Sequence, residues 1–279
     1  MKLIVESGAT KSDWRLVDKG EELARGLFHG MNVSSMPMGK VLGVIDEALG
    51  HFFPEGGELE GIYLYLAGIA TPAIREQLCE RLRSRVSVAE IDIQNDLTAA
   101  ARAACGHGSG VVAIMGTGSN SCFYDGKTVS QRVRSGGFII GDEGGAAALG
   151  KLFLADLIKE RIPQEVVENF DREFDASYGN IVEKIYHSDR PAAWLGSLAP
   201  FIVSHASEPA VRALVDKNFR DFIERTLLKY PVRELGLRVV GGFGYACRDI
   251  FSALTQEYGF TVHSYLPEPI DGLLEYHGQ

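Results

Sequence analysis

The sequence predicts an α/β protein built from a duplicated domain, and two recurring strand–turn–strand units lead to this prediction. In the first, an apolar strand ending at Glu6 passes through a turn of small residues into an alternating strand that starts near Ser12. In the second, the apolar run at residues 111–115 passes through a turn at 116–121 into a strand at 122–124. A unit that occurs twice indicates a duplication. Both turns carry Gly, Thr and Ser, whose amides and hydroxyls suit phosphate.

The first half continues with elements that are bounded by proline, glycine and helix-starting residues. In order, we expect a strand at residues 23–28, a helix at 41–52, a strand at 61–68, a helix opened by Thr71-Pro72, a strand at 86–93 and a helix at 98–104. The run at 61–68 is continuously apolar, which is typical of a buried strand. The order β-β-β-α-β-α-β-α over residues 1–108 is that of a ribonuclease-H-like domain.

The second half, residues 109–265, repeats the three opening strands and then carries a helical insertion expected over residues 144–230. The elements expected after the insertion are a strand at 237–240, a helix at 249–258 and a strand at 260–263. Residues 269–277 have the pattern of a last helix. Because no low-complexity linker separates the halves, we expect a short hinge and a continuous crevice between them.

Composition limits the range of functions. The 279 residues, of which 46% are hydrophobic, can bury the cores of two modest domains. A net charge of -9 argues against nucleic acid as a partner, because phosphate backbones are bound by clustered Lys and Arg. No apolar segment is long enough for a signal peptide or a membrane span, so we expect a cytoplasmic protein without membrane contact. The scattered cysteines are expected to be reduced and structural: Cys79, Cys105, Cys122 and Cys247.

Neither glycine-containing turn is a Walker P-loop. That motif requires Gly-x-x-x-x-Gly-Lys-Ser/Thr at the start of a helix, whereas both turns here open a strand. Together with the glycine-rich segments at residues 136–145 and 240–245, the turns resemble those of the actin, hexokinase and Hsp70 superfamily. Within that superfamily, the whole chain is similar to N-acetylglucosamine kinase and to the ATPases that activate benzoyl-CoA reductases and 2-hydroxyacyl-CoA dehydratases.

This resemblance implies an α/β fold of two ribonuclease-H-like, actin/hexokinase-like domains around an interdomain ATP cleft, with the C-terminal residues 266–279 completing the first domain. It implies ATP and Mg²⁺ as cofactors and a small-molecule sugar as substrate, and it allows a homodimer. The residues expected to bind the nucleotide are Gly8, Thr10, Lys11, Gly116, Thr117, Gly118, Ser119, Gly241 and Gly242. Lys11 fits a solvated turn lysine equally well, and residues 241–244 also fit a tight turn between strand and helix.

Asp96 is the candidate catalytic residue. It follows a strand and precedes the alanine-rich helix, where an Asp can serve simply as the helix N-cap. A carboxylate at the C-terminal end of a strand can also remove the proton from a sugar hydroxyl that attacks the γ-phosphate. Position alone does not decide between the two roles. Since the resembling kinases carry their catalytic Asp at this point, we expect Asp96 to be the general base.

Residues 136–145 supply candidates for the acceptor site. Asp142 and Glu143 lie between glycines before a helix, which fits a helix-dipole role and also a close approach of the backbone to a ligand. By resemblance, Asp142 accepts hydrogen bonds from the sugar, and Phe138 lies beside the sugar where the related kinases carry Trp. Phe keeps an apolar wall but lacks the indole N–H, so the identity of the sugar stays open.

Two positions in the first half complete the expected site. Asn32, in a Gly-x-Asn segment, fits a turn, and by resemblance it is a second sugar ligand. Glu6 ends the first strand where the superfamily usually has Asp, and its longer side chain can still hold Mg²⁺ through water. The histidines show no paired metal-ligand spacing.

The sequence therefore predicts an ATP-dependent kinase of an amino sugar, with N-acetylglucosamine phosphorylated at its 6-hydroxyl as the leading reaction. Glucosamine, N-acetylmuramic acid and glucose stay open as acceptors. The main alternative is an activator ATPase, whose iron–sulfur cluster is held by thiolates of two subunits, but none of the cysteines lies in such a loop motif. A nucleotide-binding regulator without turnover is a third alternative, because Glu6 and Phe138 depart from the family pattern.

Overall fold

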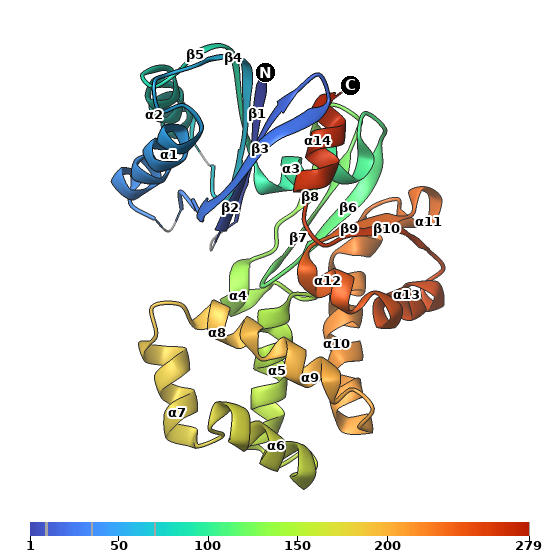
Figure 1. The fold of residues 1–279 in the computed structure, drawn as a ribbon. Coiled ribbons are helices and arrows are strands. Elements are labelled where there is room, and N and C mark those ends of the chain that lie inside the picture. Colours follow the sequence, from blue (N-terminus) through green and yellow to red (C-terminus); the bar gives the residue numbers. More distant parts are fainter. Residues whose placement is uncertain (9–10, 35, 70, 279) are drawn as a thin grey trace. The chain divides into compact units, whose positions relative to one another are not determined.

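The computed structural model describes residues 1–8, 11–34, 36–69 and 71–278, which form two compact units. The first unit comprises Met1–Gly108 and Pro269–Gln279, and the second comprises Ser109–Glu268. Each unit contains one five-stranded mixed sheet (Figure 1). The chain therefore passes between the units twice.

The first sheet has the strand order β3-β2-β1-β4-β5. Its strands are β1 (Lys2–Ser7), β2 (Lys11–Asp18), β3 (Glu21–His29), β4 (Glu58–Leu66) and β5 (Ser87–Asn95). β1 pairs antiparallel with β2 and parallel with β4, and β4 pairs parallel with β5. The carboxyl ends of β1, β4 and β5 therefore lie at one edge of the sheet.

Helices cover both faces of the first sheet. They are α1 (Met38–Phe52), α2 (Pro72–Arg83), α3 (Asp96–Cys105) and α14 (Ile270–Gly278). Leu3 and Val5 of β1 point to one face and share a core with α1 and α2. Ile4 points to the opposite face and packs with α3 and α14. Burial on both faces explains the apolar run at residues 3–5 in the middle of β1.

The last helix, α14, packs beside α3, although the chain reaches it from the second unit (Figure 1). Gly272 permits this contact, because a Cβ there would lie 2.4 Å from the carbonyl oxygen of Ala103. A polar network fastens the end of α14. His277 Nε2 lies 2.7 Å from Tyr65 Oη, and Arg102 Nη1 donates to the same hydroxyl at 2.7 Å. The imidazole is 8% exposed, and burial lowers the pKa of His277 to about 4.

The second sheet repeats the topology of the first, with the order β10-β9-β6-β7-β8. Its strands are β6 (Gly110–Met115), β7 (Ser119–Tyr124), β8 (Val129–Val133), β9 (Leu237–Val240) and β10 (Val262–Leu266). β6 pairs antiparallel with β7 and parallel with β9, as β1 does with β2 and β4. The predicted duplication of an α/β fold is confirmed.

The segment between β8 and β9 is helical. Its helices are α4 (Gly137–Ile140), α5 (Ala146–Ile158), α6 (Gln164–Phe174), α7 (Tyr178–Val182), a π-helical turn (Glu183–His187), α8 (Pro191–Ser197), α9 (Ala199–Ser204), α10 (Pro209–Arg225), a 3-10 turn (Leu227–Lys229) and α11 (Val232–Leu235). Buried side chains of α5 and α10, such as Phe153 and Phe219, form one core with Val111 and Ala113 of β6. Two further helices, α12 (Gly242–Ala246) and α13 (Arg248–Glu257), join β9 to β10.

Several elements have limits that differ from the prediction by one to three residues, as β4 does at Glu58–Leu66 where 61–68 was expected. Two differences have a physical reason in the sequence. The helical segment begins with α4, before residue 144, because the glycines on either side of Phe138 and its neighbours bend the chain around a helix of only four residues. The last strand lies at Val262–Leu266 and not at residues 260–263, since Phe260 is buried in the core before the strand starts. No helix in the described part of the chain is long and apolar enough to cross a membrane.

Candidate functional site

The parallel strands of the first unit bring several predicted residues to one edge of the sheet. Ser7 of β1 is paired with Leu66 of β4, and Leu66 with Asn95 of β5. The residues that follow these positions, Gly8 and Asp96 among them, therefore leave the sheet at the same edge. Because neighbouring strands lie about 4.8 Å apart, the backbones of Ser7 and Asn95 are separated by roughly 10 Å. Ligands of parallel α/β sheets bind at such carboxyl ends.

Asp96 is the first residue of α3, but it is not the N-cap. The capping residue is Asn95, whose Oδ1 accepts hydrogen bonds from the N–H of Thr98 at 2.8 Å and from its hydroxyl at 3.0 Å. The simple structural role that the sequence allowed for Asp96 is thus filled by its neighbour. The half-buried carboxylate of Asp96 accepts from the N–H of Leu97 at 2.9 Å, which orients it at the positive end of α3.

Asn32 lies at the same edge, beside the end of β4. Its Oδ1 accepts from the N–H of Ser34 at 3.0 Å and from the Ser34 hydroxyl at 2.7 Å, so the turn expected at this position is present. Gly68 has φ +83°, and a Cβ there would lie 2.7 Å from Asn32 Oδ1. The buried hydroxyl of Ser7 accepts from the N–H of Met31 at 2.7 Å, which ties this segment to β1.

The remaining predicted residues of the first unit lie in and around the β1–β2 turn. The N–H of Gly8 donates to the carbonyl of Lys11 at 3.1 Å. Glu6 is half-buried in β1, paired with Asp13 of β2. Lys11 is exposed at the start of β2. Thr10, predicted to bind phosphate, lies outside the described residues.

In the second unit, the β6–β7 loop rests on the N-terminus of α5. The N–H of Gly116 donates to the carbonyl of Gly118 at 3.0 Å, which closes the loop. The carbonyls of Gly116 and Thr117 accept from the N–H groups of Ala146 and Ala147, each at 2.9 Å. The loop thereby satisfies backbone donors that a helix start leaves open. A Cβ on Gly196 of α8 would lie 3.1 Å from Thr117 Cγ2, so α8 packs closely against the loop.

Asp142 lies against this loop. A Cβ on Gly118 would come 2.5 Å from Asp142 Oδ2, so the lack of a side chain at Gly118 makes room for the carboxylate. Asp142 has φ +59°, a left-handed conformation that is uncommon for a residue other than glycine. Burial raises the pKa of Asp142, while hydrogen bonds from the Ser135 side chain and the Ser119 N–H oppose that rise. A carboxylate held in an uncommon backbone conformation beside a glycine loop is typical of a ligand site.

Phe138 and the glycines predicted to bind the nucleotide at residues 241 and 242 make no contact with Asp142 that defines its position. Phe138 is half-buried in α4, packs against the core of the second unit, and its carbonyl accepts from Lys151 Nζ. Gly241 has φ +125°, and a Cβ there would lie 2.5 Å from the carbonyl oxygen of Met115. Gly241 and Gly242 therefore lie beside the start of the β6–β7 loop, at the turn from β9 into α12.

Sequence reasoning missed two polar residues of this region. Ser135 bonds Asp142 through its side chain and accepts the Asp142 N–H on its carbonyl at 3.0 Å. Asn218 of α10 hydrogen-bonds Gly144 and Gly145. Ser135 precedes the glycine-rich segment directly and could have been included with it. Asn218 is separated from the segment by more than seventy residues of helical insertion, and no local pattern marks it.

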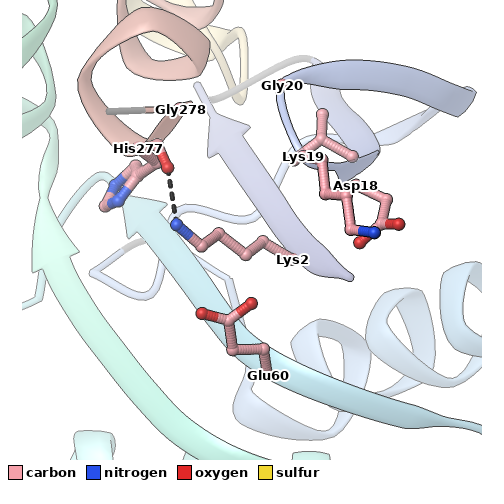
Figure 2. A pocket seen from close by; sticks show the side chains of 8 residues that line it. Lys2, Asp18, Lys19, Gly20, Glu60, His277 and Gly278 are labelled. Atoms are coloured by element: carbon pink, nitrogen blue, oxygen red, sulfur yellow. Dashed lines mark hydrogen bonds between the residues drawn. The ribbon is translucent and has the colours of Figure 1, made fainter.

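A separate cavity of about 200 Å³ lies at the other edge of the first sheet (Figure 2). Lys2 and Glu60, near the starts of β1 and β4, line it together with His277, whose carbonyl accepts from Lys2 Nζ at 2.7 Å. None of the predicted site residues lines this cavity.

Within the described part of the chain, no three His, Cys, Asp or Glu side chains come together as a metal site. In nucleotide sites Mg²⁺ is usually held by one or two carboxylates, with phosphate oxygens and waters as the other ligands. Glu6 could supply one such carboxylate.

The chain matches the BadF/BadG/BcrA/BcrD ATPase family over residues 5–177, and it belongs to that family. It is similar over 100% of its length to the solved structure of a candidate N-acetylglucosamine kinase from Porphyromonas gingivalis, with 34% identity, a TM-score of 0.89 and 99% of that chain covered. A second candidate N-acetylglucosamine kinase, from Chromobacterium violaceum, shares the fold with 20% identity and a TM-score of 0.78, covering 100% of this chain and 98% of that one.

A ROK family glucokinase from Streptomyces griseus, solved with glucose and AMPPNP, has the same fold at 15% identity and a TM-score of 0.54, with 98% and 97% of the two chains covered. No protein of curated function matches the chain. The resemblance inferred from the sequence is confirmed, and the protein is a kinase-like ATPase with the two-domain actin/hexokinase-like fold.

Proposed function

We propose that the protein is an ATP-dependent amino-sugar kinase that transfers the γ-phosphoryl group to the 6-hydroxyl of N-acetylglucosamine. The observation that carries this proposal is the full-length similarity, at 34% identity, to a candidate N-acetylglucosamine kinase. Two features of the chain support it: a half-buried carboxylate at the end of β5 that is not used as a cap, and a second carboxylate, Asp142, held beside a glycine loop.

Asp96 acts in this proposal as the general base. Phosphoryl transfer requires little covalent chemistry from the protein, so positioning the attacking hydroxyl and taking its proton are the main tasks. The hydrogen bond from the Leu97 N–H to Oδ1 orients the carboxylate of Asp96 at the end of β5, where the acceptor hydroxyl is proposed to bind. The capping bonds made by Asn95 fix the start of α3 and hence the direction of that carboxylate.

Asn32 and Asp142 bind the acceptor hydroxyls in this proposal, and Phe138 supplies an apolar wall. Asn32 can donate from its Nδ2 amide while its Oδ1 is engaged by Ser34, and an ionised Asp142 can only accept. One donor and one acceptor on different segments match the mixed hydroxyl and acetamido groups of an N-acetylated sugar. A sugar that lacks the acetyl group is expected to bind less well.

The glycine-containing loops are proposed to bind the nucleotide. Gly8, Thr10 and Lys11 would bind phosphate from one loop, Gly116, Thr117, Gly118 and Ser119 from the other, and Gly241 and Gly242 would contact the adenosine. Mg²⁺, when bound, neutralises charge that develops on the transferred phosphoryl group. Glu6 would hold one of its waters.

The experiment that tests the function is ATP consumption measured with purified protein against a panel of free sugars: N-acetylglucosamine, glucosamine, N-acetylmuramic acid and glucose. We expect acetamido sugars to stimulate ADP release most strongly. If no sugar raises ADP release above the rate without acceptor, the protein is not a sugar kinase, and the activator ATPase or the regulator without turnover becomes the better assignment.

A further inference from the structure

One face of α10 holds the loop that carries Asp142. Asn218, which is 1% exposed, accepts the N–H of Gly144 on Oδ1 at 3.0 Å and donates Nδ2 to the carbonyl of Gly145 at 3.2 Å. One turn further along, the ring of Phe222 lies against Gly144, where a Cβ would come within 2.6 Å of it. After another turn, Arg225 pairs with the carboxylate of Glu143.

The three α10 residues are spaced at i, i+4 and i+7, so they lie on one face of the helix. They contact three consecutive residues of the loop, 143–145. Asn218 is the buried and bidentate member of the set, whereas the Arg225 side chain is 67% exposed and its ion pair contributes little. A side-chain amide is suited to this contact because it carries a donor and an acceptor side by side.

The segment held by Asn218 touches both elements proposed to bind substrates. The N–H of Gly145 donates to the carbonyl of Asp142 at 2.9 Å. On the other side, a Cβ on Gly145 would lie 2.7 Å from the carbonyl carbon of Gly118. The Ser119 hydroxyl also donates to the carbonyl of Glu143 at 2.7 Å. A shift of this segment would therefore displace the acceptor carboxylate and the phosphate loop together.

We propose that Asn218 is a positioning residue that couples the acceptor carboxylate Asp142 to the phosphate-binding β6–β7 loop. This inference rests on the proposed function for the roles of those two elements. Removing the amide takes the acceptor from the buried N–H of Gly144 and leaves the Gly145 carbonyl with the N–H of Leu149, and the unsatisfied N–H of Gly144 favours a shift of the segment. A misplacement of about 1 Å in a phosphoryl-transfer site lowers the rate by roughly 100-fold.

The test compares Asn218→Leu, which keeps the size but removes both hydrogen bonds, with Ile223→Val as a control. Ile223 is buried in the same helix, and an aliphatic side chain there cannot hydrogen-bond the loop. For each variant, thermal stability, the Kd for AMPPNP without sugar, and kcat and KM for the best sugar are measured. For Asn218→Leu we expect a Kd about 10-fold weaker and a kcat/KM about 100-fold lower. Ile223→Val is expected to stay within about 2-fold of wild type in both.

Asn218→Asp is the second variant, because it keeps an acceptor for the Gly144 N–H, while its ionised carboxylate replaces the donor to the Gly145 carbonyl with a negative charge. We expect it to fall between wild type and Asn218→Leu, and it decides the question if Asn218→Leu does not fold. The inference is overturned if folded Asn218 variants keep the AMPPNP affinity and kcat/KM of Ile223→Val. If wild-type protein uses no sugar, the kinase assignment fails, and AMPPNP binding alone still decides whether Asn218 positions the phosphate loop. A wild-type protein that does not bind AMPPNP would contradict both proposals.

Discussion

Asn95 and Asp96, two neighbouring polar residues at the start of α3, differ in position. Asn95 caps the helix, whereas Asp96 is its first residue, accepts from the Leu97 N–H and is half-buried at the sheet edge. A cap needs an acceptor of any charge, whereas a general base needs a titratable one. The order Asn then Asp therefore fits a helix start with a catalytic carboxylate beside it.

Asp96→Asn tests the catalytic role. The amide keeps the shape and can still accept from Leu97, but it cannot take the hydroxyl proton, so kcat is expected to fall by about 100- to 10,000-fold. The KM values for sugar and ATP should change by less than about 3-fold, since binding groups remain. Steady-state kinetics and a melting curve measure both. A variant with wild-type kcat would remove Asp96 from the catalytic role.

The helix α14 is held against the sheet of the first unit by a buried neutral histidine, His277. His277 stacks on Tyr63 with ring centroids 3.8 Å apart and lies within hydrogen-bond distance of Tyr65. Desolvation is the largest cause of its lowered pKa, and the positive charge of Arg102 adds to it. An imidazole that is neutral in the folded protein and protonated in the unfolded chain makes stability depend on pH.

The sign of this dependence follows from the two pKa values. The folded value is about 4 and the unfolded value about 6.5, so the unfolded chain binds the extra proton between these limits. The contribution of neutral His277 to the free energy of unfolding is fully present above pH 6.5 and is lost as the pH falls toward 4. Between pH 7 and pH 5 we expect a loss of about 2 kcal/mol from this group. Urea unfolding of wild type and His277→Gln at both pH values measures it, because other titrations cancel in the difference. Equal losses in the two proteins would show that His277 is not the cause.

Local sequence patterns predicted the elements but not all of their limits. The apolar runs at residues 3–5 and 61–66 lie in β1 and β4, although β4 begins at Glu58 and ends at Leu66 where the sequence predicted a strand at 61–68. α4 was missed because its sequence, Gly-Phe-Ile-Ile, has too few residues for a helical period and two of them are exposed isoleucines. β10 was displaced because its polar residues, His263 and Ser264, carry a weaker strand pattern than the buried Phe260 before it.

Some residues of the candidate site could be predicted from local sequence, and others could not. Glycine turns and carboxylates at strand ends are visible in sequence because backbone approach and strand termination are local requirements. The contact between Asn218 of α10 and the loop at residues 143–145 cannot be read from the sequence, because Asn218 reaches Gly144 only after the helical insertion has folded. Hydrogen bonds between residues far apart in the sequence depend on tertiary packing, and no sequence spacing predicts them.

The sequence left an activator ATPase as the main alternative to a sugar kinase, and the two differ in whether the protein holds an iron–sulfur cluster. Cys247 is buried, and burial raises the pKa of its thiol to about 12, which disfavours a metal-binding thiolate. Cys122 is also buried, and the partly exposed Cys79 and Cys105 lie in the helices α2 and α3. We expect protein purified without oxygen to be colourless and to contain less than about 0.1 iron per chain, since none of the four cysteines lies in a loop motif for a shared cluster. A brown preparation with stoichiometric iron would favour the activator assignment.

Whether this family member phosphorylates a sugar is decided by the reaction product. Protein is incubated with ATP, Mg²⁺ and N-acetylglucosamine, and the mixture is followed by phosphorus NMR. We expect a new phosphomonoester resonance, coupled to the two protons of the sugar C6 methylene group, that grows in step with ADP. Loss of ATP with the release of inorganic phosphate alone, or intact ATP without any phosphorylated sugar, would contradict the sugar-kinase function.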